Sequence, residues 1–241
     1  MLIKTRGIIF RTKKYSETSV IADIYTEAKG LRSYLVSGVR TKKAKVNASL
    51  MQVLSLVDLV VYHRDDKDLT RIKEIKAAHV FTSIPFVIQK GAVGLFMAEI
   101  ARKTIRESEQ NIPLFNFLYD TILHLDAFEE SIANAHLYFM VHLCSFLGFM
   151  PSGQIEEGTP YFDLEEGCFY ENQPLHAKFL NEQLSALLSQ LLQMPRNNIH
   201  TLKMDRQQRK ELLSGLLDFY GIHIENFPTI HAHEVLEVVL A

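Results

Sequence analysis

The sequence predicts an α+β protein with two domains, a small five-stranded β-barrel over residues 1–80 and an all-α domain over residues 81–241 that carries a small β-hairpin insert. Short runs rich in β-branched and aromatic residues, separated by turn signals, predict the strands. After Pro85 the apolar residues follow a helical period instead. Glycines and prolines interrupt that period at about residues 152–176, where the insert is expected. A chain of 241 residues is long enough for two domains with buried cores.

Five runs in the first 80 residues have the composition of short strands. The fourth, "VLSLVDLVVY", has the bias of a largely buried strand. The fifth keeps no clean alternation of apolar and polar residues, so its register is not predicted. The runs are residues 2–10, 20–25, 30–36, 53–62 and 69–80. Short strands with turn signals every 10–15 residues or so indicate a closed or nearly closed barrel.

Six segments of the remaining chain have the apolar spacing of helices. Gly91 and Gly94 lie inside the first segment, and a close crossing by another helix would explain both. The third segment is expected to stop at Gly148, because glycine favours a helix C-terminus. Before the fourth, "YFDLEEGCFY" resembles two short strands around a turn. The six segments are residues 87–105, 113–125, 131–146, 177–194, 205–220 and 232–240.

The formal net charge of -2 hides a strong asymmetry between the two predicted domains. Residues 1–80 carry 16 Lys and Arg against 8 Asp and Glu, a net of +8. The rest of the chain carries 10 Lys and Arg against 20 Asp and Glu, a net of -10. This asymmetry favours a polyanion as the partner of the first domain. A solvated basic surface with no partner is the alternative.

No arrangement of residues in the sequence indicates catalysis. The chain has no phosphate-binding glycine loop, nucleophile elbow or zinc-protease motif. Carboxylates occur as adjacent pairs such as Glu156-Glu157, which do not converge on one reacting atom. The ten histidines and two cysteines, Cys144 and Cys168, lack the paired short spacing of a zinc site. We therefore expect a protein that is not an enzyme and that has no metal and no cofactor.

The sequence also lacks the features of membrane and secreted proteins. No apolar run approaches the ~18 residues of a membrane span, and the N-terminus has no apolar signal-peptide core. Two thiols without a secretion signal favour a reducing compartment. We expect a cytoplasmic protein without a membrane partner.

Nucleic-acid binding fits the basic barrel best, because small barrels bind single strands through cationic grooves and aromatic stacking platforms. The candidate cations are Lys13, Lys14, Arg32, Arg40, Lys42, Lys43 and Lys45. The candidate stacking residues are Tyr15, Tyr34 and Tyr62, and ordinary barrel packing is the alternative for each of them. Because flexible lysines read bases poorly, binding should be largely electrostatic and tolerant of sequence.

Several stretches, in this order, resemble one known family. They are Gly7-Ile8-Ile9-Phe10, Tyr15-Ser16-Glu17-Thr18-Ser19, Gly38-Val39-Arg40 with the basic residues after it, "VDLVVYHRDDKDLTRIKEI", "LYFMVHLCSFLGFMPS", "YFDLEEGCF" and "HEVLEVVL". The chain resembles the bacterial DNA repair protein RecO family over nearly its whole length, in a Bacteroidetes-like form. The resemblance implies an N-terminal OB-fold barrel joined to a helical domain.

The resemblance also implies a function and a set of partners. It implies binding of single- and double-stranded DNA, strand annealing, and assistance to recombinase loading, in the RecF pathway, on DNA coated with single-strand-binding protein. The implied protein partners are RecR and the acidic, hydrophobic C-terminal tail of single-strand-binding protein, which docks on the helical domain. Some members carry a four-cysteine zinc module, but residues 152–176 retain only Cys168, so a metal-free hairpin is expected here.

For the tail we expect an apolar groove between helices with a cation for the terminal carboxylate. The candidate cations are Lys90, Arg102, Lys103, Arg106 and Lys178, and solvated helix-face charges are the alternative for all of them. An adaptor whose barrel and helical domain bind proteins rather than DNA is a second functional hypothesis. A metal-dependent nuclease is a third, which would need carboxylates that converge. A nucleoid-associated location would accompany the first hypothesis.

Overall fold

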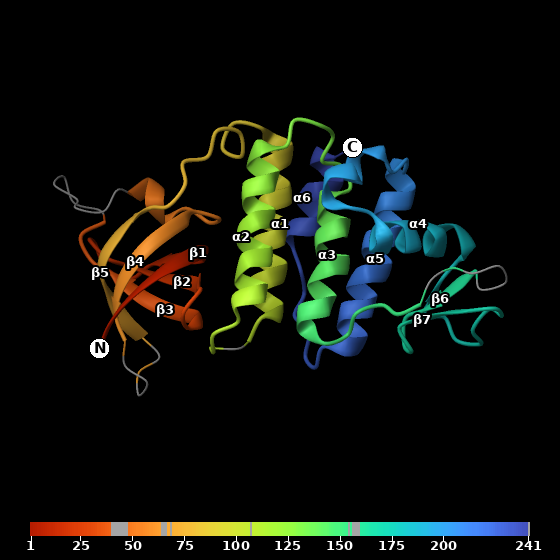
Figure 1. Ribbon diagram of the computed structural model, residues 1–241, viewed down its shortest axis with the longest axis horizontal. Helices are drawn as coiled ribbons and strands as arrows, with labels where there is room; N and C mark the ends of the chain where they lie inside the picture. The colour runs from red at the N-terminus through yellow and green to blue at the C-terminus, as the bar shows by residue number, and fades with distance from the viewer. Residues whose placement is uncertain are drawn as a thin grey trace. The chain divides into compact units, whose positions relative to one another are not determined.

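The computed structural model confirms the α+β fold, a closed five-stranded barrel followed by a helical region with a small sheet (Figure 1). It describes residues 1–39, 48–63, 67, 69–106, 108–153, 155 and 160–240. The chain forms two compact units. The first, here called the barrel unit, comprises Met1–Val87 and Ile105–Ala127, and the second, the helical unit, comprises Ile88–Thr104 and Phe128–Ala241. The units are not contiguous in sequence, and the expected domain boundary near residue 80 stays a prediction.

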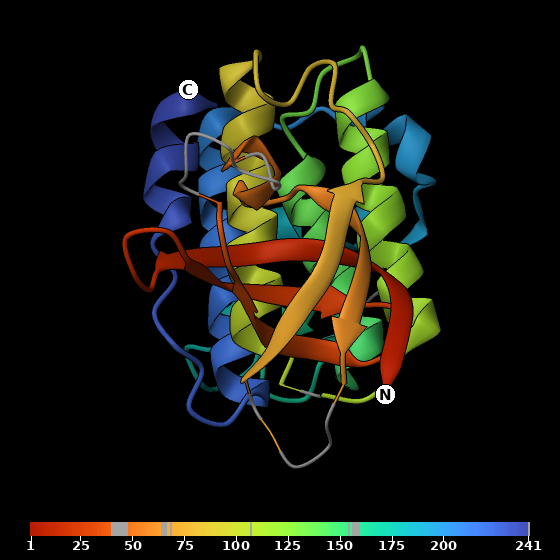
Figure 2. The ribbon, with the colours of Figure 1, turned by 90° about the vertical axis from the view of Figure 1, so that its left-hand side faces the viewer.

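The barrel strands follow the five predicted runs and close in the order β1-β2-β3-β5-β4 (Figure 2). Neighbouring strands are antiparallel except β3 and β5, which run parallel and close the barrel. The register of β5 against β4 shifts between Val60 and Val61. This irregularity accompanies the missing alternation of the fifth run. The strands are β1 (Leu2–Lys14), β2 (Val20–Thr26), β3 (Gly30–Val36), β4 (Leu56–Tyr62) and β5 (Leu69–Ala77), with a short 3-10 helix at Ala48–Met51.

Side chains of one parity on each strand fill the barrel, as the two-residue period of a strand requires. Gly7 in β1 permits the closest approach, since a Cβ there would lie 2.7 Å from Ile24 Cγ2 and 2.9 Å from Leu59 Cδ1. The core is aliphatic apart from one tyrosine and one methionine, and comprises Ile9, Val20, Ala22, Ile24, Tyr34, Val36, Val39, Met51, Val57, Leu59 and Val61.

Helix α2 (Ile112–Ala127) belongs to the barrel unit, which the sequence did not predict. The Phe10 and Tyr25 rings stack at 5.8 Å, and Tyr25 stacks on Phe115 of α2 at 6.2 Å. The Arg6 guanidinium lies 4.9 Å from the centre of the Tyr119 ring, which also belongs to α2. Side chains of the parity opposite to the core therefore form a second apolar layer between the barrel wall and α2.

The helical unit consists of α1 (Ile88–Thr104), α3 (Ala135–Leu147), α4 (Glu182–Gln193), α5 (Arg206–His223) and α6 (Ala232–Val239), with a 3-10 helix at Arg196–Thr201. Helix α3 packs against α1, α4 and α5, and α1 packs against α6. The predicted stop of α3 at Gly148 is confirmed, because this residue adopts φ 86° and its N–H reaches the Cys144 carbonyl. None of the helices in the described ranges combines the length and apolarity needed to cross a membrane.

The predicted hairpin forms, and it gains a third strand. Strand β6 (Tyr161–Asp163) lies between β7 (Cys168–Tyr170) and β8 (Phe179–Leu180), and both neighbours are antiparallel to it. Gly167, in the turn between β6 and β7, has φ 69°, a conformation that favours glycine. The Phe162 ring meets Phe219 of α5 at 5.7 Å, so the sheet packs on the helical unit.

Candidate nucleic-acid interface on the barrel and a basic pocket between helices

The carboxylates on the barrel strands are engaged by neighbouring cations. Glu27 pairs with Arg6 at 2.8 Å, and Asp23 with Arg11 at 2.7 Å. The hydrogen bond from Arg6 lowers the pKa of Glu27. Two looser pairs lie on β4 and β5, Lys76 with Asp58 at 3.4 Å and Lys73 with Glu74 at 3.7 Å. The acidic charge of the strands is therefore largely neutralised within the barrel.

Several cations of the barrel have no such partner. In the described part of the barrel, the cations with neither an ion pair nor a side-chain hydrogen bond are Lys4, Lys13, Lys14, Lys29, Lys67 and Arg71. All of them are exposed or half-exposed. These side chains carry part of the charge surplus seen in the sequence and are free to contact phosphate groups.

Part of the predicted DNA-binding set lies at one end of the barrel. Lys13 and Lys14 end β1, and Tyr15, 61% exposed, begins the turn to β2. The Val39 N–H donates to the Thr18 carbonyl at 3.0 Å, so the chain after β3 reaches this same turn. The remaining predicted cations follow Val39 in sequence and lie outside the described residues, namely Arg40, Lys42, Lys43 and Lys45.

Two other predicted residues are placed differently. Tyr34 is 1% exposed in the barrel core, where burial raises its pKa, so it offers no face on which a base could stack. Arg32 is half-buried, and its Nη2 donates to the Ser108 carbonyl at 3.3 Å, which ties it to the segment before α2. Tyr62 is 48% exposed but pairs with Leu2 at the opposite end of β1 from Lys14.

An open groove of about 860 Å³ crosses β1, β4 and β5. Its charged lining residues are Lys4, Arg6, Glu27, Asp58, Lys73, Glu74 and Lys76. Three of these cations face the three carboxylates in ion pairs. Mixed charge of this kind attracts phosphate less strongly than the β1–β2 end does.

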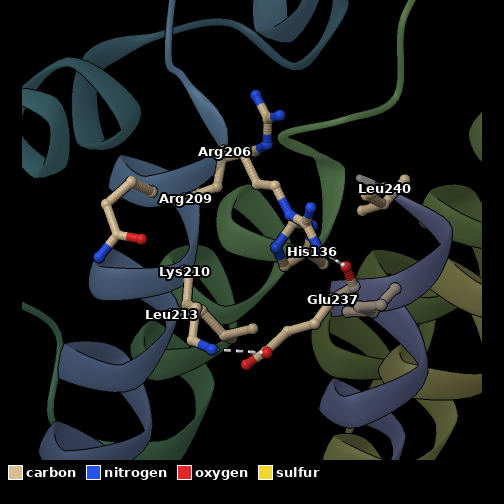
Figure 3. A pocket seen from close by; sticks show the side chains of 9 residues that line it. His136, Arg206, Arg209, Lys210, Leu213, Glu237 and Leu240 are labelled. Carbon is tan, nitrogen blue, oxygen red and sulfur yellow. Dashed lines mark hydrogen bonds and ion pairs between the residues drawn. The ribbon is translucent and has the colours of Figure 1, made fainter.

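The helical unit contains a basic pocket of about 330 Å³ between α3, α5 and α6 (Figure 3). Three cations from the start of α5 and three leucines give it a mixed cationic and apolar lining. The residues are His136 of α3, Arg206, Gln207, Arg209, Lys210 and Leu213 of α5, and Leu236, Glu237 and Leu240 at the C-terminal end of the chain. We call this site the α5 pocket.

The cations of the α5 pocket stand where a helix normally prefers acids. Asp205 caps α5 with a full capping box, in which the Gln208 N–H donates to the Asp205 carboxylate and Gln208 Oε1 accepts from the Asp205 N–H. Arg206, Arg209 and Lys210 follow in the first turns, against the positive end of the helix dipole. Such a local electrostatic cost, with no acid in the first turn of α5, is a signal of function that sequence reasoning missed.

His136 lies at the α3 side of the α5 pocket. It is 2% exposed and its Nδ1 has no hydrogen-bond partner among the described residues. Its ring meets Phe96 of α1 edge-on at 5.9 Å. Burial, assisted by the charge of Arg209, lowers the pKa of His136 to about 3, so the ring is neutral.

Two of the pocket cations contact α6. The Lys210 ammonium pairs with the Glu237 carboxylate at 2.8 Å and lowers the pKa of that carboxyl. Arg206 Nη2 donates to the Glu237 carbonyl at 2.9 Å (Figure 3). Arg209, by contrast, donates to the Met204 carbonyl. The pocket thus already holds one carboxylate, supplied by the chain itself.

The predicted partner-binding cations do not line the α5 pocket. Lys90 is 8% exposed inside α1, so it does not present an ammonium group at the surface as expected. Lys103 is engaged by Glu99 at 2.5 Å and Lys178 by Asp218 at 3.1 Å. Arg102 in the last turn of α1 and Arg106 just after it stay candidates.

The thiols do not meet in a metal site. Cys144 is fully buried, which raises its pKa to about 12, and Cys168 is half-buried on β7. Within the described segments, no three His, Cys, Asp or Glu side chains form a group that could hold a metal ion. The structure therefore offers no candidate metal centre in the segments that it describes.

Comparisons with known proteins agree with this architecture. Residues 1–81 match the family model described as Recombination protein O N terminal, and residues 86–230 match Recombination protein O C terminal. The chain is 38% identical to DNA repair protein RecO of Bacteroides fragilis and 35% identical to that of Phocaeicola vulgatus, with 98% of each chain covered in both alignments. It is 32% identical to DNA repair protein RecO of Flavobacterium psychrophilum, with both chains covered in full. The chain belongs to the RecO family.

Proposed function

We propose that the protein is a DNA-binding repair protein that anneals complementary strands and mediates recombinase loading on DNA coated with single-strand-binding protein. The observation that carries this proposal is the set of exposed cations on a barrel in which Asp23, Glu27, Asp58 and Glu74 are already paired. The similarity to relatives named DNA repair protein RecO supports the repair role. The protein would act on DNA in the cytoplasm, at the nucleoid, with RecR as a protein partner.

Annealing needs no covalent chemistry, and the proposal therefore assigns no enzymatic activity. Two complementary strands repel each other through their phosphates, and a protein promotes pairing when it neutralises that charge and leaves the base edges free. Lysine is suited to this task because its ammonium is a point charge without a fixed hydrogen-bonding fork. Lys13 and Lys14 would hold the phosphate backbone, and Tyr15 would offer a face for one unpaired base.

The α5 pocket is the proposed site for the acidic, hydrophobic tail of single-strand-binding protein. Its leucines would receive the apolar end of the tail, and Arg206, Arg209 and Lys210 would receive its carboxylates. The position of three cations at a helix start, where they oppose the dipole, supports an anionic partner. With one site for DNA and one for the tail, a single chain could bind single-strand-binding protein and replace it on the DNA.

The DNA proposal is tested by the double variant K13A/K14A. Single-stranded oligonucleotide binding is measured by fluorescence anisotropy at several salt concentrations. Each lost phosphate contact should reduce the slope of log affinity against log salt by about 0.7, so the slope should fall by about 1.4. The matched control is K178A/K203A, which removes two exposed lysines from the helical unit and changes the net charge equally.

Equal slopes for K13A/K14A and the control would contradict the placement of DNA at this end of the barrel. Wild-type protein that binds no oligonucleotide even at low salt would contradict the DNA-binding proposal as a whole. That second result would favour the alternative, an adaptor whose barrel and helical unit bind proteins.

A further inference from the structure

Helix α6 places the chain's own acidic and apolar segment against the α5 pocket. Leu236 and Glu237 of α6 and Leu240, which follows it, form one wall of the pocket. We propose that α6 is an intramolecular competitor, which partly occupies the site for the acidic tail and must shift for the tail to bind. This inference rests on the proposed tail-binding function of the pocket.

The chemistry of α6 resembles that of the proposed ligand. Residues 234–240 read "EVLEVVL", a run of aliphatic side chains with two carboxylates. Leu236 is 2% exposed, and Glu237 pairs with Lys210 at 2.8 Å (Figure 3). One buried leucine beside one paired carboxylate is the arrangement that an acidic, hydrophobic tail would make on the same surface. The two segments would therefore compete for the same cation.

The start of α6 is held by hydrogen bonds to α1. Glu99 of α1 accepts hydrogen bonds from the N–H groups of His231 at 3.1 Å and Ala232 at 2.7 Å. These bonds and the Lys103 ion pair outweigh burial and lower the pKa of Glu99, so the carboxylate is charged. Lys103 also donates to the Thr229 carbonyl. The start of α6 is thus anchored to α1.

The C-terminal half of α6 is held much less firmly. Leu236 is the residue of α6 that is buried, while Val235 is 50% and Val238 75% exposed. Among the described residues, the hydrogen bonds that join α6 to α5 both involve Glu237, whose carboxylate accepts from Lys210 and whose carbonyl accepts from Arg206. A short helix anchored at one end can pivot about that end when the contacts at the other end are replaced. The anchor at Glu99 and the exchangeable pair at Glu237 provide that arrangement.

Competition of this kind lowers the apparent affinity for the tail. A segment tethered beside the pocket has a high effective concentration, so the closed arrangement is favoured without any tight contact. The tail then binds only the fraction of molecules in which the pocket is open, and its dissociation constant rises by the inverse of that fraction. High local concentration of single-strand-binding protein on coated DNA would overcome this, whereas scattered free copies would not.

The test uses a labelled peptide with the sequence of the C-terminal tail of single-strand-binding protein, and full-length wild-type and variant proteins. Glu237→Gln removes the competing carboxylate and keeps its shape, so peptide affinity should rise about two- to fivefold, the range for one exposed ion pair. Glu234→Gln is the matched control, because Glu234 is an exposed acid of the same helix with no ion pair among the described residues. Its affinity should equal that of wild type.

A second measurement does not depend on the variants at Glu237. Hydrogen exchange of the amides of residues 232–240 should accelerate when wild-type protein binds the peptide, because a displaced α6 loses its protection. Glu99→Gln, which weakens the anchor without touching the pocket, should also raise peptide affinity. Thermal unfolding of each variant checks that the protein remains folded.

The outcomes separate this inference from the proposed function. Equal affinities of E237Q and E234Q, or slower exchange in α6 on peptide binding, would overturn the competitor and leave tail binding intact. Absence of peptide binding by wild type, E237Q and E99Q alike would overturn the proposed tail site and the competitor with it. Tighter binding by E237Q together with faster exchange in α6 would support both.

Discussion

The two basic sites of this protein differ in whether their cations are paired with acids of the same chain. On the barrel, carboxylates such as Glu27 and Asp23 are paired with selected arginines, and lysines such as Lys13 and Lys14 are left free. In the helical unit, Lys210 of the α5 pocket is held by Glu237 of the same chain. Free, flexible lysines suit a ligand with regularly repeated charge, because register and orientation need not be fixed. A pocket that already holds an acid of its own chain suits a short ligand that must displace that acid to bind.

The largest expected effect concerns a buried acid that lies in neither basic site, so its loss should lower stability without changing either binding activity. Asp126, 4% exposed at the end of α2, accepts hydrogen bonds from the N–H groups of Thr82, Ser83 and Ile84, the shortest to each being 2.9 Å. Asp126→Asn keeps one oxygen but directs an amide N–H at these donors. We expect a loss of about 2–4 kcal/mol in the free energy of unfolding, measured by urea denaturation, because buried charge-assisted bonds are broken. DNA and peptide binding by the folded fraction should be unchanged.

The same carboxylate predicts a pH dependence. Burial raises the pKa of Asp126, but the three backbone N–H groups and His79 outweigh this, so the pKa lies well below its ordinary value of 3.8. A lowered carboxyl pKa contributes stability that is complete above the ordinary value and is lost as the pH falls towards the folded-state value. Wild type should therefore lose stability below about pH 4 more steeply than D126N does. Parallel pH profiles would show that Asp126 is not the group responsible.

Two double variants, one in each basic site, test whether DNA and the tail peptide bind independently. The expected effect on ligand affinity is of intermediate size. Replacing both Arg206 and Lys210 by Gln should weaken binding of the tail peptide at least about tenfold, because two charge-assisted contacts are removed. The same variant should leave oligonucleotide affinity within about twofold of wild type. K13A/K14A should show the opposite pattern in the same two anisotropy assays. A variant that weakened binding of both ligands equally would mean that DNA and the peptide share one anion-binding site.

The sequence predicted those features that depend on residues close together in the chain, and it missed those that depend on contacts between distant residues. The barrel and the stop of α3 at Gly148 follow from local periodicity and glycine chemistry, so they were predictable. The burial of Tyr34 was also within reach, because Tyr34 has the same strand parity as Val36, a core residue of β3. A charge-based choice of candidates overlooked that parity.

The α5 pocket, by contrast, could not be predicted from the sequence. It joins His136 to Leu236, one hundred positions later in the chain, and no periodicity reports such a meeting. The available signal was three cations within the five residues after the capping residue Asp205, with no acid in the first turn of the helix. The assignment of α2 to the barrel unit is equally non-local, because it depends on the stacking of Tyr25 on Phe115.

The smallest expected effect comes from a substitution that removes the ion-pair partner of a barrel cation. Glu27→Gln removes the carboxylate that engages Arg6, whose side chain is 39% exposed. Solvent screens such a pair, so the unfolding free energy should fall by only about 0.5 kcal/mol. The freed guanidinium should raise oligonucleotide affinity up to about threefold and steepen the salt slope, since one more cation can release a counterion. Glu109→Gln is the control, because Glu109 is an exposed acid of the barrel unit away from the β1–β2 turn, with no ion pair in the described residues, and its loss changes the net charge equally. If both variants bound DNA equally well, net charge rather than the pairing of individual cations would set DNA affinity on the barrel.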